Sequence, residues 1–330
     1  MDQILFLKFG ALGDVLMTTP LLRQTRRAFP EAKIDYCVAE SFAVAVRNNP
    51  HLENVITFMP NIFTDKKIVE FLKLARCLRG KKYDLIFVLD KHPVFAVLAF
   101  LAGARQRIGF NRDRMARFFL TKSVQYGALR HDIHCNLDLL KKIAVPDYAD
   151  TKLDFFETVT RQEILARFPH LQEPYFVCAN SGGSNIREAT AIRRLPTPLF
   201  VNFLAVLAAE QLTVLVGDSG DREYYSSLPL PETVFNLAGT TSIAECATII
   251  AHCQKMFTTD CGLMHLAVTT GAPIRAFFGP THPRRLGPLT DGVEIIWKDE
   301  AVYDPKYHTS GRIPRQQYFR NLGLRDLVGS

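Results

Sequence analysis

Three short segments carry residues whose types and spacing suit chemistry on a hydroxylated or anionic ligand. The first is Phe9-Gly-Ala-Leu-Gly-Asp14, the second starts at Asn180-Ser-Gly-Gly-Ser-Asn185 and continues to Arg193, and the third is Thr258-Thr-Asp-Cys-Gly-Leu-Met-His265. Each follows a short apolar run. Together they supply carboxylates, small polar residues and cations, which serve in proton transfer and in anion binding.

The first segment places a carboxylate just after a predicted strand. Gly10 and Gly13 flank a tight turn, but the G-x-x-G spacing lacks the third glycine of a dinucleotide fingerprint. Asp14 has two interpretations. It either caps the helix that follows, or it faces a ligand and accepts a proton, with helix N–H groups favouring its charged form and Lys8 as a partner cation. The residues alone leave both open.

The other two segments suit phosphate groups. Glycine and serine let the backbone approach a ligand closely, and Arg193 adds a nearby cation, although a solvated loop would have the same composition. In the third segment a helix opens at Gly262, and free N–H groups at a helix start suit a pyrophosphate. Asp260 could instead cap that helix, and His265 could pack in its first turn.

Two further features are ambiguous on sequence. Glu245 could accept both hydroxyls of a ribose, or it could be an exposed helix side chain. A dense basic stretch fits an anionic acceptor, lipid headgroups or a solvated face; it comprises Arg105, Arg107, Arg112, Arg114 and Arg117. No nucleic-acid-binding signature and no metal site are recognisable, since Asp-x-Asp pairs and His–Glu clusters are absent.

The elements that must position these residues alternate between strands and helices, which predicts parallel strands with helical crossovers. In the first half the expected strands are 4–9, 33–39, 84–89 and 107–110, and the expected helices are 14–29, 64–78 and 94–102. In the second half the expected strands are 175–179, 213–216, 234–236, 255–258 and 274–278, and the expected helices are 198–210, 242–252 and 262–270. In the helix 64–78, Ile68, Phe71, Leu72 and Ala75 share the apolar face.

Two α/β halves of similar size follow from this pattern. A chain of 330 residues suggests about two domains, and a polar stretch over 147–167 separates the halves. We expect an N-terminal domain over 1–157 and a C-terminal domain over 158–330, with a last helix at about 312–327 that packs back on the N-terminal domain. Ligands of doubly wound sheets bind at the carboxyl ends of the strands, so the site is expected in a cleft between the halves.

Composition excludes several classes of protein. With 48% apolar and 22% charged residues, the chain is neither disordered nor fibrous. The longest apolar run, 93–104, is too short to cross a bilayer, and no signal peptide is visible at the start. The seven cysteines have no zinc or redox spacing, so reduced thiols and a cytoplasmic location are expected. The net charge of +7 favours an anionic partner.

The motifs resemble those of glycosyltransferase family 9, the ADP-heptose:lipopolysaccharide heptosyltransferases. The resemblance is carried by GALGDVLMTTPLLRQTRRAFP, GARQRIGF, RRLP, NLAGTTSIAECATIIAHC and TTDCGLMHLAVTTGAPIRAFFGPTHP. It implies a GT-B fold, in which two Rossmann-like domains with doubly wound parallel sheets face each other across a cleft. It also implies an inverting, metal-independent transfer of heptose from ADP-heptose to a lipopolysaccharide or lipooligosaccharide core acceptor, without a cofactor, at the inner face of the inner membrane.

The resemblance also assigns roles to residues. Asp14 matches the catalytic carboxylate, and Arg193 stands where members often carry a lysine that contacts the donor phosphates. The expected donor-binding residues are Ser181, Gly182, Gly183, Arg193, Glu245, Thr259, Asp260, Gly262, Leu263 and His265. The expected acceptor-binding residues are Lys8, Gly13, Arg105, Arg107 and Arg112. The alternatives are the same fold acting with another nucleotide sugar on a different surface glycan, and a protein that binds a nucleotide or glycan without catalysis.

Overall fold

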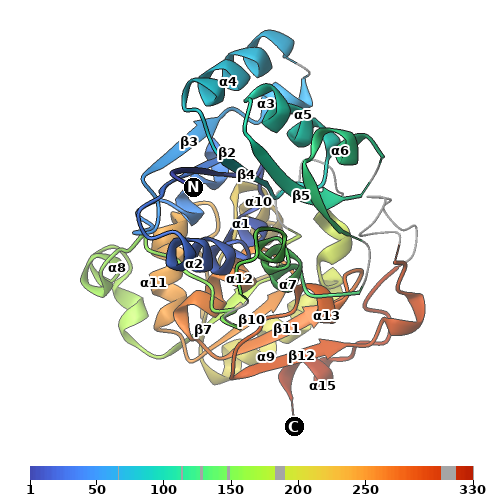
Figure 1. The fold of residues 1–330 in the computed structure, drawn as a ribbon. Coiled ribbons are helices and arrows are strands. Elements are labelled where there is room, and N and C mark those ends of the chain that lie inside the picture. Colours follow the sequence, from blue (N-terminus) through green and yellow to red (C-terminus); the bar gives the residue numbers. More distant parts are fainter. Residues whose placement is uncertain are drawn as a thin grey trace. The chain divides into compact units, whose positions relative to one another are not determined.

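The computed structural model describes residues 1–65, 67–112, 114–126, 129–146, 149–182, 190–305 and 317–329. The chain divides into two compact units, Met1–Phe156 and Glu157–Ser330. Each unit is an α/β structure built on a six-stranded sheet whose paired strands are all parallel (Figure 1). The α/β prediction is therefore confirmed.

The first unit has the strand order β3-β2-β1-β4-β5-β6. Its strands are β1 (Gln3–Leu7), β2 (Lys33–Ala39), β3 (Asn54–Phe58), β4 (Leu85–Val88), β5 (Gln106–Asn111) and β6 (Lys122–Gln125). Its helices are α1 (Leu12–Leu16), α2 (Thr19–Ala28), α3 (Asn61–Thr64), α4 (Ile68–Gly80), α5 (Pro93–Leu101), α6 (Arg114–Phe119) and α7 (Asp132–Leu137), with 3₁₀ turns at Glu40–Ala45 and Leu140–Ile143.

The second unit repeats this topology, with the order β12-β11-β10-β7-β8-β9. Its strands are β7 (Tyr175–Ala179), β8 (Leu212–Leu215), β9 (Val234–Asn236), β10 (Lys255–Thr259), β11 (Ile274–Phe278) and β12 (Val293–Trp297). Its helices are α8 (Arg161–Arg167), α9 (Thr197–Glu210), α10 (Ser219–Ser226), α11 (Ile243–Ala251), α12 (Gly262–Thr270), α13 (Pro283–Leu286) and α15 (Leu324–Val328), with 3₁₀ turns at Pro169–Gln172, Thr190–Arg193 and Glu300–Val302.

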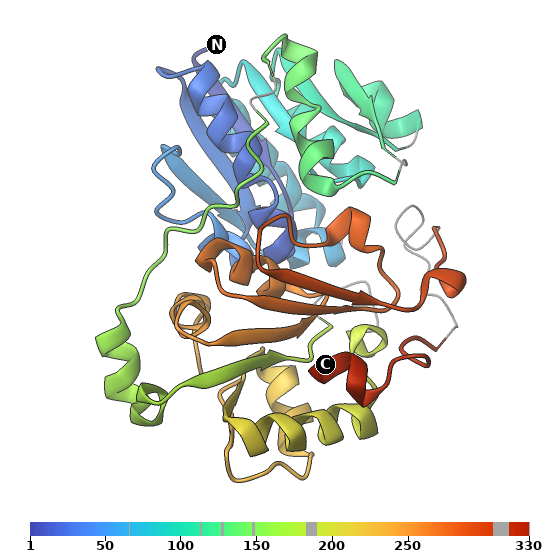
Figure 2. The same ribbon diagram turned by 90° about the horizontal axis from the view of Figure 1, so that it is seen from below.

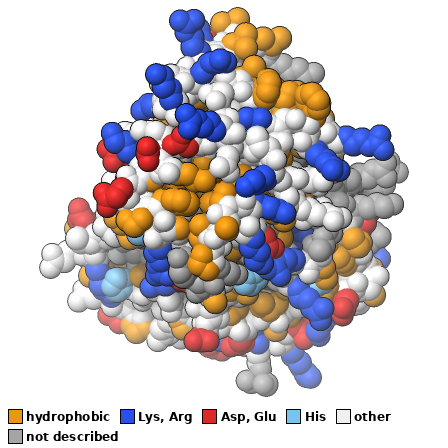
Figure 3. All heavy atoms as spheres, in the orientation of Figure 1, with side chains coloured by type: hydrophobic (Ala, Val, Ile, Leu, Met, Phe, Trp, Pro, Cys, Tyr) orange, Lys and Arg blue, Asp and Glu red, His pale blue; other side chains and the backbone are white. Residues whose placement is uncertain are grey.

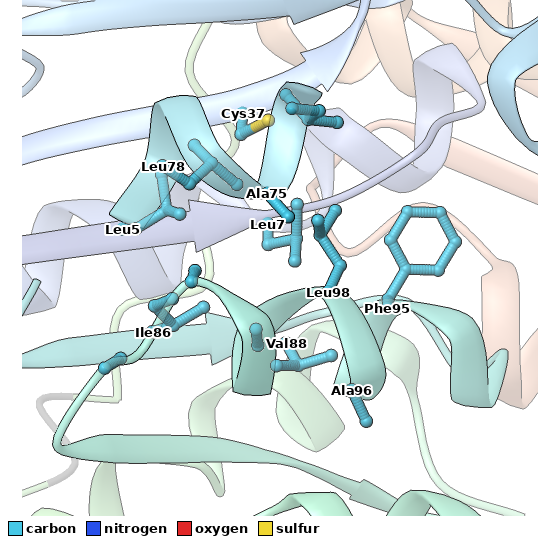
Figure 4. Close-up of a cluster of buried hydrophobic side chains, with 14 of the residues drawn as sticks. Leu5, Leu7, Cys37, Ala75, Leu78, Ile86, Val88, Phe95, Ala96 and Leu98 are labelled. Atoms are coloured by element: carbon cyan, nitrogen blue, oxygen red, sulfur yellow. The ribbon is translucent and has the colours of Figure 1, made fainter. Parts of the chain in front are cut away.

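One layer of helices covers each sheet face through alternating strand residues. In the first unit Leu5 and Leu7 of β1 point to the same face as Ile86 and Val88 of β4, and they pack against α4, α5 and α6 (Figure 4). In the second unit α9 covers one face with Phe200, Phe203, Leu204 and Leu207. Because each strand is short and largely buried, it appears in the sequence as an apolar run.

Three predicted elements differ from the structure. The helix expected over 14–29 is two helices, because Pro20 stands in the first turn of α2 and proline cannot continue a helix from the preceding turn. In α4 the core side consists of Leu74, Ala75 and Leu78, so the prediction that Ile68 and Leu72 belong to the packed face is wrong.

The third difference concerns the C-terminus. Residues 306–316 lie outside the described part, and the helix that follows spans only Leu324–Val328. This helix packs against α9, and its Leu327 belongs to the core of the second unit (Figure 2). The described part of the segment is therefore fixed to the second unit. Among the described residues, no helix is long and apolar enough to cross a membrane.

Candidate functional site

Asp14 follows the carboxyl end of β1, next to the position where the strand order of the first sheet reverses. Ala11 is the N-cap of α1, and Asp14 is the third helical residue with no capping role there, so the N-cap interpretation is wrong. The Asp14 side chain is 41% exposed, and its Oδ2 lies 3.7 Å from Lys8 Nζ. The carboxylate is thus reachable by a ligand, as general-base chemistry requires, and it lies beside a cation.

Lys8 links the two strands that flank this reversal. Its side chain is buried, and its Nζ lies 3.7 Å from Asp90 Oδ2 as well as from Asp14. Asp90 lies two residues after the end of β4, and its Oδ2 accepts a hydrogen bond from the Phe9 N–H at 3.2 Å. The Lys8 ammonium group therefore lies between the carboxylates of Asp14 and Asp90.

The glycines of the loop have a steric role. A Cβ at Gly10 would lie 2.1 Å from the Phe42 ring, so only glycine fits without movement of that ring. Gly13 is buried within α1. The close packing of this loop on its own unit fixes the position from which Asp14 projects.

A second charged group at the same edge was missed by the sequence interpretation. Lys91 Nζ lies 2.7 Å from Asp132 Oδ2 and 4.2 Å from the centre of the Tyr126 ring. The Tyr126 hydroxyl donates to Asp132 Oδ1 at 3.3 Å. The polar pair Asp90-Lys91 directly after an apolar strand was the available signal, since strand carboxyl ends share one edge of a parallel sheet.

The basic stretch does not lie at one place. Arg105 precedes β5 and pairs with Asp84, which precedes β4, so it lies at the amino edge of the sheet. Arg107 donates to the backbone carbonyls of Phe119 and Ala104, and burial lowers its pKa. These two arginines therefore lie away from Asp14, because the amino ends of parallel strands are at the opposite edge of the sheet, and their contact with the acceptor stays a prediction. Arg112 follows the carboxyl end of β5 and is exposed.

In the second unit, Ser181 and Thr259 join the carboxyl ends of the neighbouring strands β7 and β10. The Thr259 hydroxyl donates to the Ser181 carbonyl at 2.7 Å, and both residues are buried. Asn180 is also buried and accepts a hydrogen bond from the Leu195 N–H at 2.7 Å. The solvated-loop interpretation is thus wrong for 180–182, where Gly182 is buried too, while Gly183 lies outside the described residues.

Arg193 and Asp260 are brought together from segments far apart in sequence. Arg193 Nη1 lies 3.3 Å from Asp260 Oδ2, and both side chains are largely buried. Asp260 is not the cap of α12, because the N-cap is Cys261 and no side chain caps the helix. This pair places a guanidinium beside the carboxyl end of β10, and guanidinium groups match the geometry of phosphate groups.

The start of α12 adds backbone donors to this region. Leu263 and His265 are buried in its first turns, which contain no acidic side chain. Burial raises the pKa of Cys261 to about 11, so the N-cap thiol stays neutral. The positive end of this helix is therefore not neutralised by a charged side chain of its own first turn, which suits a phosphate.

Glu245 is used within its own unit. It forms a capping box with Ser242, whose N–H donates to Glu245 Oε2 at 2.7 Å, and its other oxygen pairs with Arg167. Both carboxylate oxygens thus have protein partners. The arrangement does not support the expected ribose contact, because the three-residue spacing from Ser242 makes Glu245 a capping residue.

A buried ion pair supports the β7 loop and was not predicted. Arg194 Nη2 lies 2.7 Å from Asp221 Oδ1 and stacks over the Tyr224 ring. Burial raises the pKa of Asp221, although Ser181 and Arg194 counteract it by hydrogen bonding to the ionised carboxylate. The RRLP motif therefore contributes one arginine to the candidate site and one to the scaffold. In the described ranges, no group of three or more His, Cys, Asp or Glu side chains could hold a metal ion.

Comparison with known proteins agrees with these features. A family model described as glycosyltransferase family 9 (heptosyltransferase) matches residues 71–311. The chain is 26% identical over 316 residues to lipopolysaccharide heptosyltransferase 2 of Escherichia coli K12, covering 89% of this chain and 87% of that protein.

Solved structures share the fold. A glycosyl transferase of family 9 from Veillonella parvula superposes with a TM-score of 0.83 at 21% identity, covering 99% of this chain and 96% of that one. The E. coli ADP-heptose lipopolysaccharide heptosyltransferase II gives a TM-score of 0.71 at 21% identity, covering 94% and 97%. The resemblance noted in the sequence is confirmed: with a GT-B fold and a family model that covers most of its length, the chain belongs to glycosyltransferase family 9 and is a glycosyltransferase.

Proposed function

We propose that this enzyme transfers heptose from ADP-heptose to a lipopolysaccharide-type core acceptor, with inversion at the anomeric carbon and no required metal ion. The observation that carries the proposal is the accessible Asp14 carboxylate beside the buried Lys8. An inverting displacement needs one base and no covalent nucleophile, so a single carboxylate suffices.

In the proposed step, the acceptor hydroxyl oxygen attacks the anomeric carbon while the bond to the diphosphate oxygen breaks. Asp14 takes the hydroxyl proton, and ADP leaves with the electron pair of the broken bond. Lys8 holds Asp14 in its ionised form before the reaction, because a nearby cation disfavours protonation of a carboxylate. Because Asp14 and Lys8 both belong to the first unit, we assign the acceptor to that unit.

We assign the donor to the second unit. Arg193 and the first N–H groups of α12, at Gly262 and Leu263, would stabilise the charge that develops on the diphosphate. Ser181, Thr259, Asp260 and His265 would line the same region. Support for an ADP-sugar comes from the name of the E. coli relative, which includes ADP-heptose.

For the acceptor, we propose Lys8, Gly13 and Arg112 as contacts and add Lys91, because all four lie on elements that meet the carboxyl edge of the first sheet. An anionic core acceptor complements these cations. Such acceptors are lipid-anchored, so we further propose that the enzyme works peripherally at the cytoplasmic face of the inner membrane.

A donor panel tests the proposal. Purified protein is mixed with ADP-heptose or with GDP-, UDP- or TDP-sugars, and melting temperature and transfer to a heptose-deficient core acceptor are measured with and without EDTA. We expect ADP-heptose to raise the melting temperature and to give a product of inverted anomeric configuration by NMR, in EDTA as well.

Each other outcome contradicts part of the proposal. Transfer from a different nucleotide sugar would show that ADP-heptose is not the donor. A raised melting temperature without turnover would indicate a binding protein. Retained configuration would exclude a single displacement from the face opposite the leaving group. Activity abolished by EDTA would overturn the metal-independent step.

A further inference from the structure

The helix layer that covers one face of the first sheet leaves large apolar side chains in solvent. On α4, Ile68 is 70% exposed, Val69 is 65% exposed and Leu72 is 52% exposed. These residues form an apolar stripe in the sequence, yet the core contacts are made by Leu74, Ala75 and Leu78. An exposed apolar cluster of this kind marks a contact surface.

A second apolar cluster lies on α5 and α6. Phe118 is 81% exposed, and Met115 and Phe100 are exposed as well. The Phe119 ring joins them, with its centre 5.2 Å from that of Phe118 and 5.3 Å from that of Phe100. Since α4 contacts α5 and α5 contacts α6, both clusters belong to one continuous helix layer.

The direction of these helices places part of this surface near the proposed base. α4 leads from the carboxyl end of β3 to the amino end of β4, and α6 leads from the carboxyl end of β5 to the amino end of β6. The first turns of both helices, with Ile68 and Met115, therefore lie toward the carboxyl edge. Asp14 lies at this same edge of the sheet.

Charge on this surface is strongly one-sided. α4 contains three Lys or Arg and one acid, α6 contains two Arg and no acid, and α5 contains no charged residue. The three helices together carry a formal +4, more than half of the net charge of +7 of the whole chain. Figure 3 shows basic and apolar side chains interspersed over the part of the molecule that holds α3, α4 and α5.

From these observations we propose that the outer surface of α4, α5 and α6 binds an anionic phospholipid bilayer. Phe118, Leu72 and Ile68 enter the headgroup region while the surrounding Lys and Arg contact lipid phosphates. A second copy fits less well, because two such surfaces would repel each other through their charge. The inference refines the membrane location given under the proposed function, and its test does not depend on the transfer reaction.

Vesicle co-sedimentation of the full-length protein tests the proposal. The probes are vesicles of phosphatidylcholine alone and vesicles that contain about one third phosphatidylglycerol. We expect binding to the anionic vesicles at least about tenfold stronger than to the neutral ones, weakening as salt is raised. The double variant Leu72→Ser/Phe118→Ser should lose about tenfold in partitioning.

Matched controls use exposed apolar residues of the second unit. Leu289 and Val302 are 39% and 37% exposed, and the variant Leu289→Ser/Val302→Ser should bind vesicles like the unmodified protein. Arg114→Gln/Arg117→Gln should reduce binding to anionic vesicles only. Melting temperatures and the ADP-induced melting shift show that each variant is folded.

Three results would overturn the proposal. These are equal binding to neutral and anionic vesicles, unchanged binding of the Leu72→Ser/Phe118→Ser variant, and a concentration-dependent dimer that this variant abolishes. In the last case the surface joins two copies. Loss of transfer to a lipid-free acceptor in an Asp14 variant concerns the proposed function alone, so the two failures are distinguishable.

Discussion

In both units, polar or charged residues follow the two strands that flank the reversal of strand order, β1 and β4 in the first and β7 and β10 in the second. The first unit places Lys8 between the carboxylates of Asp14 and Asp90. The second places a guanidinium against Asp260 beside an uncapped nine-residue helix. One topology thus carries a candidate proton acceptor in one copy and a candidate anion site in the other, which shows that the loops, and not the sheet order, decide the chemistry.

The surfaces of the two units differ as well. The first unit exposes Ile68, Leu72 and Phe118 among basic residues, whereas the largest exposed apolar side chains of the second unit, such as Leu289 and Ile295, are well under half exposed in the described part. The unit proposed to receive a lipid-borne acceptor is thus also the unit with a surface suited to lipid. Substitutions in one unit should therefore affect a different measured property from substitutions in the other unit.

The largest effect among the supporting residues is expected for Arg193→Ala. Loss of a charge-assisted hydrogen bond to a phosphate should raise the Kd for ADP about 10- to 100-fold, as measured by calorimetry. Arg193→Lys should give an intermediate value, because lysine keeps the charge but not the planar fork. The control Arg222→Ala removes an arginine whose side chain donates to the Ala238 carbonyl; if it weakened ADP binding equally, the assignment of Arg193 would fail.

In the first unit, a smaller effect is expected for Lys8→Met. Turnover should fall about tenfold, and the acid limb of the pH–rate profile should move to higher pH, because a carboxylate that loses a neighbouring cation is harder to ionise. The Kd for ADP should stay within about twofold. An unmoved acid limb with a normal melting temperature would show that Lys8 does not support the base.

The smallest effect concerns stability of the first unit. Arg23 on α2 pairs with Asp150 at 2.8 Å and also with Asp154. The hydrogen bond from Arg23 lowers the pKa of Asp150, so this stabilisation is present above its ordinary pKa of 3.8 and is lost as pH falls through the lower folded value. Burial raises the pKa of the neighbouring Asp154. The contribution of Asp150 is therefore obtained by comparing the stability of an Asp150 variant with that of the unmodified protein at each pH.

Asp150→Asn should therefore lower the free energy of unfolding by about 1 kcal/mol at neutral pH. The difference from the unmodified protein should shrink toward zero as the pH falls below the ordinary carboxyl pKa of 3.8 and through the lower folded value. Denaturant titration at several pH values measures it, with the exposed Asp291→Asn as control. A difference that grows in acid would mean that Asp150 is not held ionised by Arg23.

The sequence predicted central strands better than edge strands. The bounds of β2, β7 and β11 and of α12 agree with the expected ranges, because continuous apolar runs and a glycine at the helix start define them. Three outer strands, β3, β6 and β12, were not predicted. Their residues are only partly buried, so polar residues interrupt the apolar pattern that reveals a strand.

For the candidate site, strand ends were informative and sequence proximity was misleading. Asp14 and Asp260 were predicted because each follows an apolar strand, and the same rule would have found Asp90 and Lys91. Arg105 and Arg107 were grouped with Arg112 only because they are neighbours in the chain, although a strand lies between them. Partners such as Asp132 for Lys91 depend on tertiary packing, which local patterns do not contain.

The most direct test of the central claim is a paired measurement on Asp14→Asn, with single-turnover transfer and ADP binding determined on the same preparation. The two units are expected to respond independently: transfer should fall by about 10²–10⁴-fold, the range for loss of a general base, while the Kd for ADP stays within about twofold of the unmodified value. Transfer within a few fold of the unmodified enzyme would contradict the account, because the proton would then leave the acceptor without this carboxylate.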